Sequence, residues 1–373
     1  MTQTHYTAST PGRVCLFGEH QDYLGLPVIA AAISRRITVD AQAINAPEVH
    51  LSLPDVGCEV RFSIDRFPLS YQHDRDYFRS AMNVLHREGL RFSRGIAASV
   101  TGTIPINAGT SSSSALLVTW LNVLSQLADP AEAGQAVPSP LTPCQLAEFG
   151  YVAEVLEFGE PGGMMDHYAT AIGGLIYLEL TPVVRVETLP MGQLAGTFVL
   201  GDSGEPKDTV GILRHVKFGM LGALEKLKQH HPDFDLHTAP LDSAIDYRHL
   251  LTTDELSLLQ SNLSDRDILR EALALLRSPE SNDVRFGQLL NEHQDNLREA
   301  KRISTPKIDR MLTAAMQAGA LGGKINGSGG GGCMFAYAPH DPEAVAEAIE
   351  RQGGKAHIIT VDAGTQTHFG ISV

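Results

Sequence analysis

Polar and hydrophobic residues alternate in short segments over the first hundred residues of this chain. Alternation with a period of two is typical of half-buried strands, and it predicts strands at residues 38–42, 59–63 and 96–104. A further strand at residues 6–9 is expected to end in a turn at Pro11-Gly12. Between these strands, a helical spacing of apolar residues predicts a helix over residues 76–89 that stops at Gly89.

Helical patterns dominate the second half of the chain. A capping box at Thr142–Gln145, with Pro143 at the first helical position, predicts a helix that reaches about Phe158. Periodic leucines or capping residues predict further helices near residues 207–230, 253–276, 282–302, 305–319 and 341–352. Strands are expected at residues 198–204, where a polar turn follows, and at residues 357–361.

The length of 373 residues indicates about two domains, at roughly 150 residues per domain. Composition changes near residues 185–197, so we place the boundary there and expect domains at residues 1–190 and 191–373. Residues 129–143 are rich in Pro and Ala and lack any period, which indicates a linker or surface insertion.

The charge and cysteine content narrow the class of protein. A formal net charge of −14 without a Lys/Arg block argues against a nucleic-acid partner, but it is compatible with a locally bound phosphorylated ligand. The four cysteines have no C-x-x-C spacing, which is typical of reduced thiols. Without a signal peptide or a membrane-spanning run, we expect a cytoplasmic protein with no membrane partner, as a monomer or weak homodimer.

A small, hydroxyl-rich loop precedes an apolar helix at residues 105–127. Four serines, Ser111–Ser114, follow Gly109 and Thr110, and Ser113 or Ser114 is expected to cap the helix. Free N–H groups in the first helical turn and the helix dipole together favour an anion. The loop therefore predicts a phosphate or metal site, and the alternative is a serine-rich surface turn.

Two other polar segments could contact a ligand. Glu19, His20 and Asp22 lie between two apolar runs and could converge on a hydroxyl-rich ligand, since carboxylates accept hydrogen bonds and histidine can donate or accept. A metal site and a solvated turn are the alternatives. Asp166 follows the glycine pair Gly162-Gly163 and precedes an apolar run, so it is either a partly buried catalytic group or a helix N-cap.

The third unusual segment is the glycine-rich stretch at residues 322–332. Ordering many glycines is entropically unfavourable. The stretch lies between a helix and an apolar strand, which favours a tight, ligand-facing turn over a flexible linker.

Taken together, these motifs resemble those of the GHMP small-molecule kinases. Residues 11–25 (Pro-Gly-Arg-Val-Cys-Leu-Phe-Gly-Glu-His-Gln-Asp-Tyr-Leu-Gly) resemble the galactokinase signature. Residues 109–114 are similar to the family's phosphate loop, Gly-Leu-Ser-Ser-Ser-Ala, and residues 163–166 to its Gly-Ile-Met-Asp segment. Residues 322–333 resemble the third family motif, so the resemblance spans nearly the whole chain.

The resemblance implies an α+β protein with two domains and a site in the cleft between them. Its N-terminal domain would be similar to the second domain of ribosomal protein S5, and its C-terminal domain would be ferredoxin-like. The implied ligands are ATP, Mg²⁺ and a small-molecule sugar.

The resemblance also implies a role for individual residues. Asp166 would be the catalytic aspartate, with Arg13 beside it, and Glu154 would hold Mg²⁺ together with Ser112 or Ser113. Sugar hydroxyls would be bound by Glu19, His20, Asp22 and Gly163. ATP phosphates would be bound by Gly109, Thr110, Ser111, Ser112, Ser113 and Ser114, and the third motif, with Gly329 and Gly330, would close over them.

One segment departs from the galactokinase pattern. Residues 202–209, Asp-Ser-Gly-Glu-Pro-Lys-Asp-Thr, resemble mevalonate kinases more, and the sugar-contacting tyrosine of galactokinases has no clear match. We therefore expect a kinase that phosphorylates the anomeric hydroxyl of a galactose-like monosaccharide. The alternatives are a mevalonate-type kinase and a non-catalytic sugar and ATP sensor.

Overall fold

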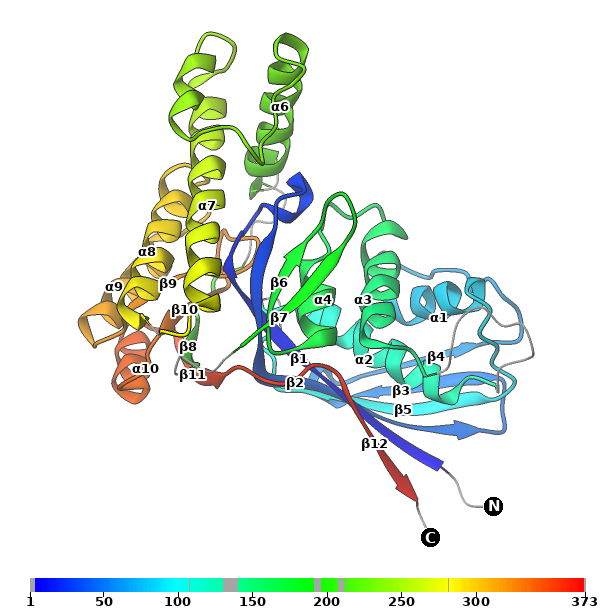
Figure 1. The fold of residues 1–373 in the computed structure, drawn as a ribbon. Coiled ribbons are helices and arrows are strands. Elements are labelled where there is room, and N and C mark those ends of the chain that lie inside the picture. Colours follow the sequence, from blue (N-terminus) through cyan, green and yellow to red (C-terminus); the bar gives the residue numbers. More distant parts are fainter. Residues whose placement is uncertain are drawn as a thin grey trace.

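The computed structural model describes residues 4–106, 108–129, 140–190, 196–206, 211–212, 214–280 and 282–371. Within these residues the chain forms two sheets with helices packed on them (Figure 1). Most of the insertion expected at residues 129–143, and residues 207–209 of the segment that departs from galactokinases, lie outside the described residues. No helix in the described ranges is long and apolar enough to cross a membrane.

The first sheet has eight strands and is mainly antiparallel. Its principal order is β12-β1-β2-β5-β3-β4, while β6 pairs with β2 and β7 with β6. The strands are β1 (Thr4–Phe17), β2 (Val28–Ile44), β3 (Glu48–Leu53), β4 (Cys58–Ser63), β5 (Gly95–Gly102), β6 (Leu175–Glu179), β7 (Arg185–Leu189) and β12 (Gln366–Ile371). The strands predicted at residues 38–42 and 59–63 fall within β2 and β4, and the strand predicted at residues 96–104 overlaps β5 but extends two residues past its end.

The turn predicted at Pro11-Gly12 is wrong, because β1 runs continuously through it. The register with β2 shifts between Pro11 and Gly12, so the two residues form an irregularity in a long strand rather than a reversal. A Cβ on Gly12 would lie 2.8 Å from the carbonyl oxygen of Thr110, so the glycine lets the phosphate loop approach the strand. This irregular point places Arg13 directly beside that loop.

Four helices cover one face of the first sheet (Figure 1). They are α1 (Tyr77–Arg87), α2 (Ser112–Leu127), α3 (Pro143–Tyr151) and α4 (Met165–Ile172). Helix α2 is apolar on most of its surface, and Trp120, Leu121 and Leu124 are buried in the core beneath it. The capping box predicted at Thr142 and Gln145 is confirmed at the start of α3. The helix then continues as the π-helix η3 (Val152–Leu156), which carries Glu154.

The second sheet has the antiparallel order β11-β8-β10-β9. Its strands are β8 (Thr197–Asp202), β9 (Gly322–Ile325), β10 (Cys333–Tyr337) and β11 (Lys355–Thr360). Helices α9 (Pro306–Gln317) and α10 (Pro342–Arg351) share a hydrophobic core with one set of its side chains. The other set packs against α7 (Thr253–Arg277), α8 (Asp283–Glu299) and residues of β1 and β2. The expected α+β fold is confirmed.

A helical arm rises from the second half of the chain (Figure 1). It contains η4 (Arg214–Phe218), α6 (Gly219–His230), η5 (Asp242–Tyr247) and the first part of α7. Its hydrophobic core includes Leu26, and Leu24 packs against it. Both leucines come from the segment that follows β1 and contains η1 (Asp22–Leu24), so the arm supports the loop that carries the predicted sugar ligands.

The C-terminal strand crosses the boundary expected from composition. β12 pairs with β1 along residues 366–371, and β11 and β12 lie on different sheets. A division at residue 190 therefore describes the two sheets with the exception of β12, which completes the first sheet. We retain the division at residues 190 and 191 as a proposal with that one addition.

Candidate active site

A cavity of about 780 Å³ lies where the two halves of the chain meet. The end of β5, the start of α2, the π-helix η3, the start of α4 and the glycine-rich loop after β9 all contribute to its wall. Predicted site residues that line it are Arg13, Gly109, Ser111, Ser112, Ser113, Glu154 and Asp166. Motifs far apart in the sequence are thus brought to one cavity.

Arg13 and Asp166 form an ion pair in this wall. Arg13 Nε donates to Asp166 Oδ1 at 2.8 Å, and Nη2 lies 2.7 Å from the same oxygen. Arg13 Nη1 donates to the carbonyl oxygen of Gly109, and the Arg13 amide donates to the carbonyl oxygen of Thr110 at 3.2 Å. The guanidinium is therefore fixed on the phosphate loop and orients Asp166.

Arg13 is the main cation that keeps Asp166 ionised. Burial alone would raise the pKa of Asp166, but the charges of Arg13 and His167 and the hydrogen bonds from Arg13 and Ser111 together outweigh burial and lower that pKa below its ordinary value. Asp166 is thus ionised at neutral pH and can accept a hydrogen bond from a hydroxyl group. The alternative role as helix N-cap is not what the structure shows, because Met164 is the N-cap of α4 and Asp166 lies in its first turn.

Glu154 is the second carboxylate of the cavity. Its Oε2 accepts from Ser114 Oγ at 2.7 Å and lies 2.7 Å from His167 Nε2. Burial opposes ionisation, but the hydrogen bond and charge of His167 lower the pKa of Glu154 from its ordinary value. π-helical turns are rare in proteins, and those that occur are often found at functional sites. Here the π-helical turn carries Glu154 into the cavity wall.

The donors around Glu154 fit a magnesium ion. Mg²⁺ prefers oxygen ligands and usually combines one or two carboxylates with water and substrate phosphates. Glu154 supplies an ionised carboxylate, and the hydroxyl-bearing Ser112 and Ser113 line the same cavity. His167 holds the carboxylate from behind, as outer partners of metal ligands commonly do. No group of three or more His, Cys, Asp or Glu side chains suited to a metal occurs among the described residues.

The start of α2 differs from the prediction that Ser113 or Ser114 is the cap. The N-cap is Ser111, which has a left-handed backbone (φ 59°) and makes no side-chain capping bond. Ser114 lies inside the helix and donates to Glu154 instead. The Oγ of Ser111 is buried, and the Ser111 hydroxyl is one of the groups that lower the pKa of Asp166. With its uncapped N–H groups, this helix end can bind an anion.

The glycine-rich loop meets the phosphate loop at Gly109. A Cβ on Gly109 would lie 2.5 Å from the carbonyl oxygen of Asn326, so only glycine permits this approach. Gly327 and Ser328 line the cavity. The predicted ATP ligands Gly329 and Gly330 turn toward the end of α8, where the Gly330 amide donates to the carbonyl oxygen of Ile303 at 2.7 Å.

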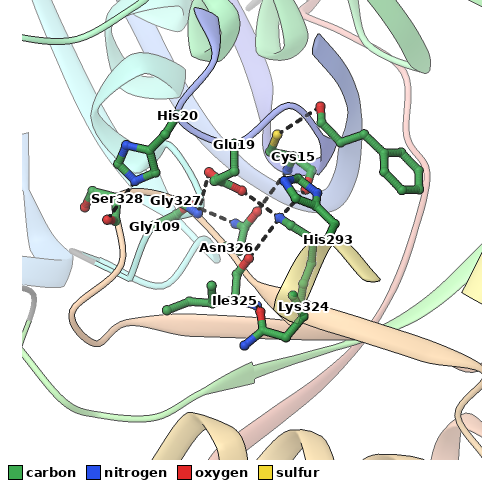
Figure 2. A network of polar contacts seen from close by, with 12 residues as sticks. Cys15, Glu19, His20, Gly109, His293, Lys324, Ile325, Asn326, Gly327 and Ser328 are labelled. Carbon is green, nitrogen blue, oxygen red and sulfur yellow. Dashed lines mark hydrogen bonds and ion pairs between the residues drawn. The ribbon is translucent and has the colours of Figure 1, made fainter. Parts of the chain in front are cut away.

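Glu19 belongs to a buried polar network that Figure 2 shows. Its Oε2 accepts from Lys324 Nζ at 2.7 Å, and its Oε1 accepts from the Gly327 amide at 2.9 Å. Lys324 also donates to the carbonyl oxygens of Cys15 and Ile325, both at 2.9 Å. Both carboxylate oxygens of Glu19 are therefore bound within the protein, and Glu19 is only 3% exposed.

Asn326 connects this network to the Arg13–Asp166 ion pair. Its Oδ1 accepts from the Cys15 amide at 2.9 Å, and its Nδ2 donates to the carbonyl oxygen of Gly109 at 2.8 Å (Figure 2). Arg13 donates to the same Gly109 oxygen. One asparagine side chain thus joins β1, the phosphate loop and the glycine-rich loop.

His20 also contacts the glycine-rich loop. Nε2 lies 3.0 Å from the Ser328 carbonyl oxygen, and Nδ1 lies 3.0 Å from the Tyr23 hydroxyl. Burial and then the charge of Lys301 lower the pKa of His20 to about 4. A neutral ring fits both contacts, with Nε2 donating to the carbonyl and Nδ1 accepting from Tyr23.

Asp22 has a different environment from Glu19. The Tyr23 amide donates to its Oδ1 at 2.9 Å, and no cation forms an ion pair with it among the described residues. Burial and the charge of Asp166 raise the pKa of Asp22 to about 6. A Cβ on Gly163 would lie 1.7 Å from Asp22 Oδ2, so Gly163 provides the space that this carboxylate occupies.

Several residues of the site were not predicted from the sequence. His167, Lys324 and Asn326 bond directly to the predicted residues Glu154, Glu19 and Gly109. His167 follows Asp166 immediately, and Lys324 and Asn326 are polar residues within a glycine-rich stretch, so the sequence contained a signal for each. Their partners come from distant segments, which no local pattern identifies.

The far end of the cavity is apolar. Ile37 on β2, Val100 on β5 and Val56 in η2 (Pro54–Val56) contribute to it, and Leu53, Ile104 and Ile106 complete that wall. Val56 and Ile106 are 58% and 59% exposed, which is high for aliphatic residues that line a cavity. A flat aromatic group placed between them would remove this apolar surface from water.

Comparison with known proteins identifies relatives along the whole chain. The galactokinase galactose-binding signature matches residues 2–43, the GHMP kinases N terminal domain residues 76–174, and the GHMP kinases C terminal domain residues 269–355. The mevalonate kinase of Thermococcus gammatolerans is 30% identical over 366 residues, which cover 95% of each chain. The galactokinase of Lacticaseibacillus casei is 26% identical, over 90% of this chain and 85% of its own.

Solved structures have the same fold. Lactococcus lactis galactokinase complexed with galactose superposes with a TM-score of 0.83 at 22% identity, covering 97% of this chain and 95% of its own. Methanococcus jannaschii mevalonate kinase gives a TM-score of 0.71 at 18% identity, covering 95% and 98%.

Proposed function

This chain belongs to the GHMP kinase family, and on that premise we propose that it transfers the γ-phosphoryl group of ATP to the anomeric hydroxyl of a galactose-like monosaccharide. One observation carries the proposal: the ionised Asp166, held by Arg13, shares a cavity with Glu154 and the uncapped start of α2. A hydroxyl acceptor, a metal and a triphosphate each find a suitable partner there.

Asp166 is proposed to receive the acceptor hydroxyl. The hydroxyl oxygen forms a bond to the γ-phosphorus while the bond from that phosphorus to the bridging oxygen of ADP breaks. The hydroxyl proton passes to the Asp166 carboxylate. Since the pKa of Asp166 is lowered, the carboxylate is a weak base, which suits a loose transition state where the proton leaves late. Arg13 stabilises the charge that develops between the reactants.

Glu154, with Ser112 or Ser113, is proposed to hold Mg²⁺. The ion would neutralise part of the triphosphate charge. The uncapped amides at the start of α2 and the buried hydroxyl of Ser111 are proposed to bind phosphate oxygens. The apolar end of the cavity, with Val56 and Ile106, is proposed to hold the adenine base.

The acceptor is proposed to bind between the loop at residues 19–23 and the loop before Asp166. Asp22 is a carboxylate without a cationic partner in the described residues, and it can accept hydrogen bonds from sugar hydroxyls. His20 lies beside it. We assign Glu19 to holding the loops together rather than to sugar contact, because both of its oxygens are bound inside the protein.

A mevalonate-type kinase is the second candidate. Sequence identity favours it slightly, at 30% against 26% for galactokinase. Lys217 also offers a cation for a carboxylate: its Nζ donates to the Pro161 carbonyl oxygen at 2.8 Å and lies 4.9 Å from the centre of the Tyr23 ring. The mevalonate-like segment after β8 does not decide the question, because Ser203 Oγ donates to the Gly332 carbonyl oxygen at 2.6 Å and so braces the glycine-rich loop.

A coupled ADP-release assay tests both candidates. We would measure turnover with Mg-ATP against galactose, arabinose, galacturonate, glucuronate, N-acetylgalactosamine, mannose and mevalonate, and identify each product by ³¹P NMR. An anomeric sugar phosphate supports the proposal, whereas turnover of mevalonate alone supports the second candidate. Absence of transfer to every acceptor, with ATP still bound, would favour a non-catalytic sensor. Asp166→Ala is the control for ADP release that does not come from this site.

A further inference from the structure

The cavity wall has an unusual charge balance for a site that takes a triphosphate. Its acidic residues are Asp55, Glu154, Glu160 and Asp166, whereas Arg13 and Arg75 are the only cations among the described residues that line it. Arg13 is already bound to Asp166 and to the Gly109 carbonyl. Arg75 is therefore the one lining cation that can turn toward a polyanion without breaking the catalytic pair.

Arg75 is held at the edge of the cavity in a constrained conformation. It lies in the loop before α1 and has a left-handed backbone, with φ of 61°, which is uncommon for a residue other than glycine. The Arg75 carbonyl oxygen accepts from the Tyr77 amide at 2.8 Å, which fixes this turn at the start of α1. Strained positions of this kind are frequent at ligand-binding sites.

The guanidinium makes a two-pronged contact with Glu160. Nε donates to Oε1 at 2.5 Å, and Nη2 donates to Oε2 at 2.8 Å. The Arg75 side chain is nevertheless 60% exposed, and that of Glu160 is 22% exposed, so water can reach the pair. Exposed ion pairs are weak, and a phosphate group offers an arginine the same paired oxygen geometry as a carboxylate.

We propose that Arg75 binds the phosphates of the nucleotide, and that Glu160 occupies its guanidinium when no nucleotide is bound. This inference rests on the proposed function, since it assumes that the cavity takes ATP. The exchange replaces one carboxylate by phosphate oxygens and moves the negative charge of Glu160 away from the triphosphate. It predicts opposite effects for the two members of the ion pair, which a merely structural pair would not show.

Binding of Mg-AMP-PNP, a non-hydrolysable ATP analogue, measures these effects by calorimetry. Arg75→Met is expected to weaken binding by about tenfold to a hundredfold, because charge-assisted hydrogen bonds to phosphate are lost. Arg75→Lys should recover part of the lost affinity for Mg-AMP-PNP. Glu160→Gln is expected to tighten binding by about two- to fivefold, because a neutral amide competes less for the guanidinium. Adenosine, which has no phosphate, should bind all variants alike.

A neighbouring ion pair provides the matched control. Arg87 on α1 pairs with Glu157, three residues before Glu160, and neither residue lines the cavity. Arg87→Met and Glu157→Gln should leave the Kd for Mg-AMP-PNP within about twofold of the parent protein. Comparing the two ion pairs thus separates a change in Kd that comes from disturbing the loop from one that comes from losing a contact inside the cavity.

Each outcome has a distinct meaning. Failure of the parent protein to bind Mg-AMP-PNP would overturn the proposed kinase function itself. If the parent protein binds, unchanged or weaker binding by Glu160→Gln would overturn the exchange with Glu160. Equal weakening of adenosine and Mg-AMP-PNP by Arg75→Met would show that Arg75 only supports the fold of the loop, and would overturn its contact with phosphate.

Discussion

Glu19 and Asp22 lie in the same loop, yet their surroundings differ in almost every respect. Glu19 is bound by Lys324 and by the Gly327 amide, and both of its oxygens are in use. Asp22 accepts from the neighbouring Tyr23 amide and has no cationic partner in the described residues. The first carboxylate is enclosed by the second half of the chain, and the second faces the loop before Asp166.

Their pKa values move in opposite directions for this reason. Burial raises the pKa of a carboxylate, and at Glu19 the charges of Lys324 and Arg13 outweigh burial, so its pKa is lowered. At Asp22 burial dominates, no ion pair forms among the described residues, and the nearby charge of Asp166 adds to the effect of burial, so the pKa rises to about 6. Glu19 is therefore a stable anion inside the fold, whereas Asp22 has no ion-pair partner among the described residues.

This difference indicates two roles within one motif. A charge that is fully paired inside the protein stabilises the arrangement of loops, and an uncompensated carboxylate beside a catalytic group is typical of a ligand-binding position. We therefore propose that the motif fastens the loop through Glu19 and offers Asp22 to the acceptor. The predictions below test this division.

The largest effect, on the free energy of unfolding, is expected from removing Lys324, the cation that pairs with Glu19. Lys324→Met leaves Glu19 buried and without its ion-pair partner, and we expect the free energy of unfolding to fall by about 3–5 kcal/mol. Urea unfolding at pH 7, followed by circular dichroism, measures it. A loss below about 1 kcal/mol would contradict the role given to this pair.

A matched control and a double variant sharpen that measurement. Lys228 on α6 is exposed, so Lys228→Met should change the free energy of unfolding by less than about 0.5 kcal/mol. Glu19→Gln combined with Lys324→Met should be less destabilised than the sum of the two single variants, because the pair is lost only once.

Asp22→Asn tests the other region and should lower activity at neutral pH without destabilising the fold. Loss of a charged acceptor for sugar hydroxyls is expected to lower kcat/KM for the acceptor by about ten- to a hundredfold, which corresponds to about 1.5–3 kcal/mol. The KM for Mg-ATP should stay within about twofold, because Asp22 does not line the cavity assigned to the nucleotide. An equal loss for both substrates would argue that Asp22 supports the whole site instead.

The sequence predicts the elements and the motifs of this site better than their contacts. The strands around β2, β4 and β5, the capping box at Thr142 and the helices of the second half follow from local patterns. The turn expected at Pro11-Gly12 fails, because a proline and glycine can also sit at a bulge in a long strand, and only pairing with β2 distinguishes the two.

The limits are clearest at residues whose partners lie far away in the chain. Nothing local to Glu19 shows that Lys324, 305 residues further on, takes its carboxylate. The strand β12 is equally non-local, since it pairs with β1 at the opposite end of the chain. Local sequence therefore identifies polar residues near a ligand site, and tertiary packing decides which of them remain available.

The pH dependence of acceptor use separates the two carboxylates further. The ionised carboxylate of Asp22 accepts stronger hydrogen bonds than the protonated acid does, and its pKa is about 6. With a neutral sugar, kcat/KM should therefore rise between pH 5 and pH 7 and level off above, with a loss of about tenfold for each pH unit below 6. The profile for Asp22→Asn should be flat in this range, and a parent profile without an inflection near pH 6 would count against the assignment.

Stability follows the same group with the opposite sign. The ordinary pKa of an aspartate is 3.8, so folded Asp22 keeps a proton that the unfolded chain has already released. The stability linked to this proton is fully present below about pH 4 and is lost as the pH rises through about 6. Urea unfolding of the parent protein and of Asp22→Asn should therefore diverge across this window.

The smallest effect is expected at Tyr23, whose side-chain hydroxyl contacts the acceptor region through His20. Tyr23→Phe removes the hydroxyl that lies 3.0 Å from His20 Nδ1 and leaves the ring and its contact with Lys217 in place. We expect kcat/KM for the acceptor to fall by about two- to tenfold, the worth of one neutral hydrogen bond. His20 would still donate to the Ser328 carbonyl oxygen, so the glycine-rich loop and the Kd for Mg-ATP should be unchanged. A loss of kcat/KM as large as that of Asp22→Asn would instead place Tyr23 in direct contact with the acceptor. The acceptor site would then include the Tyr23 ring as well as the Asp22 carboxylate.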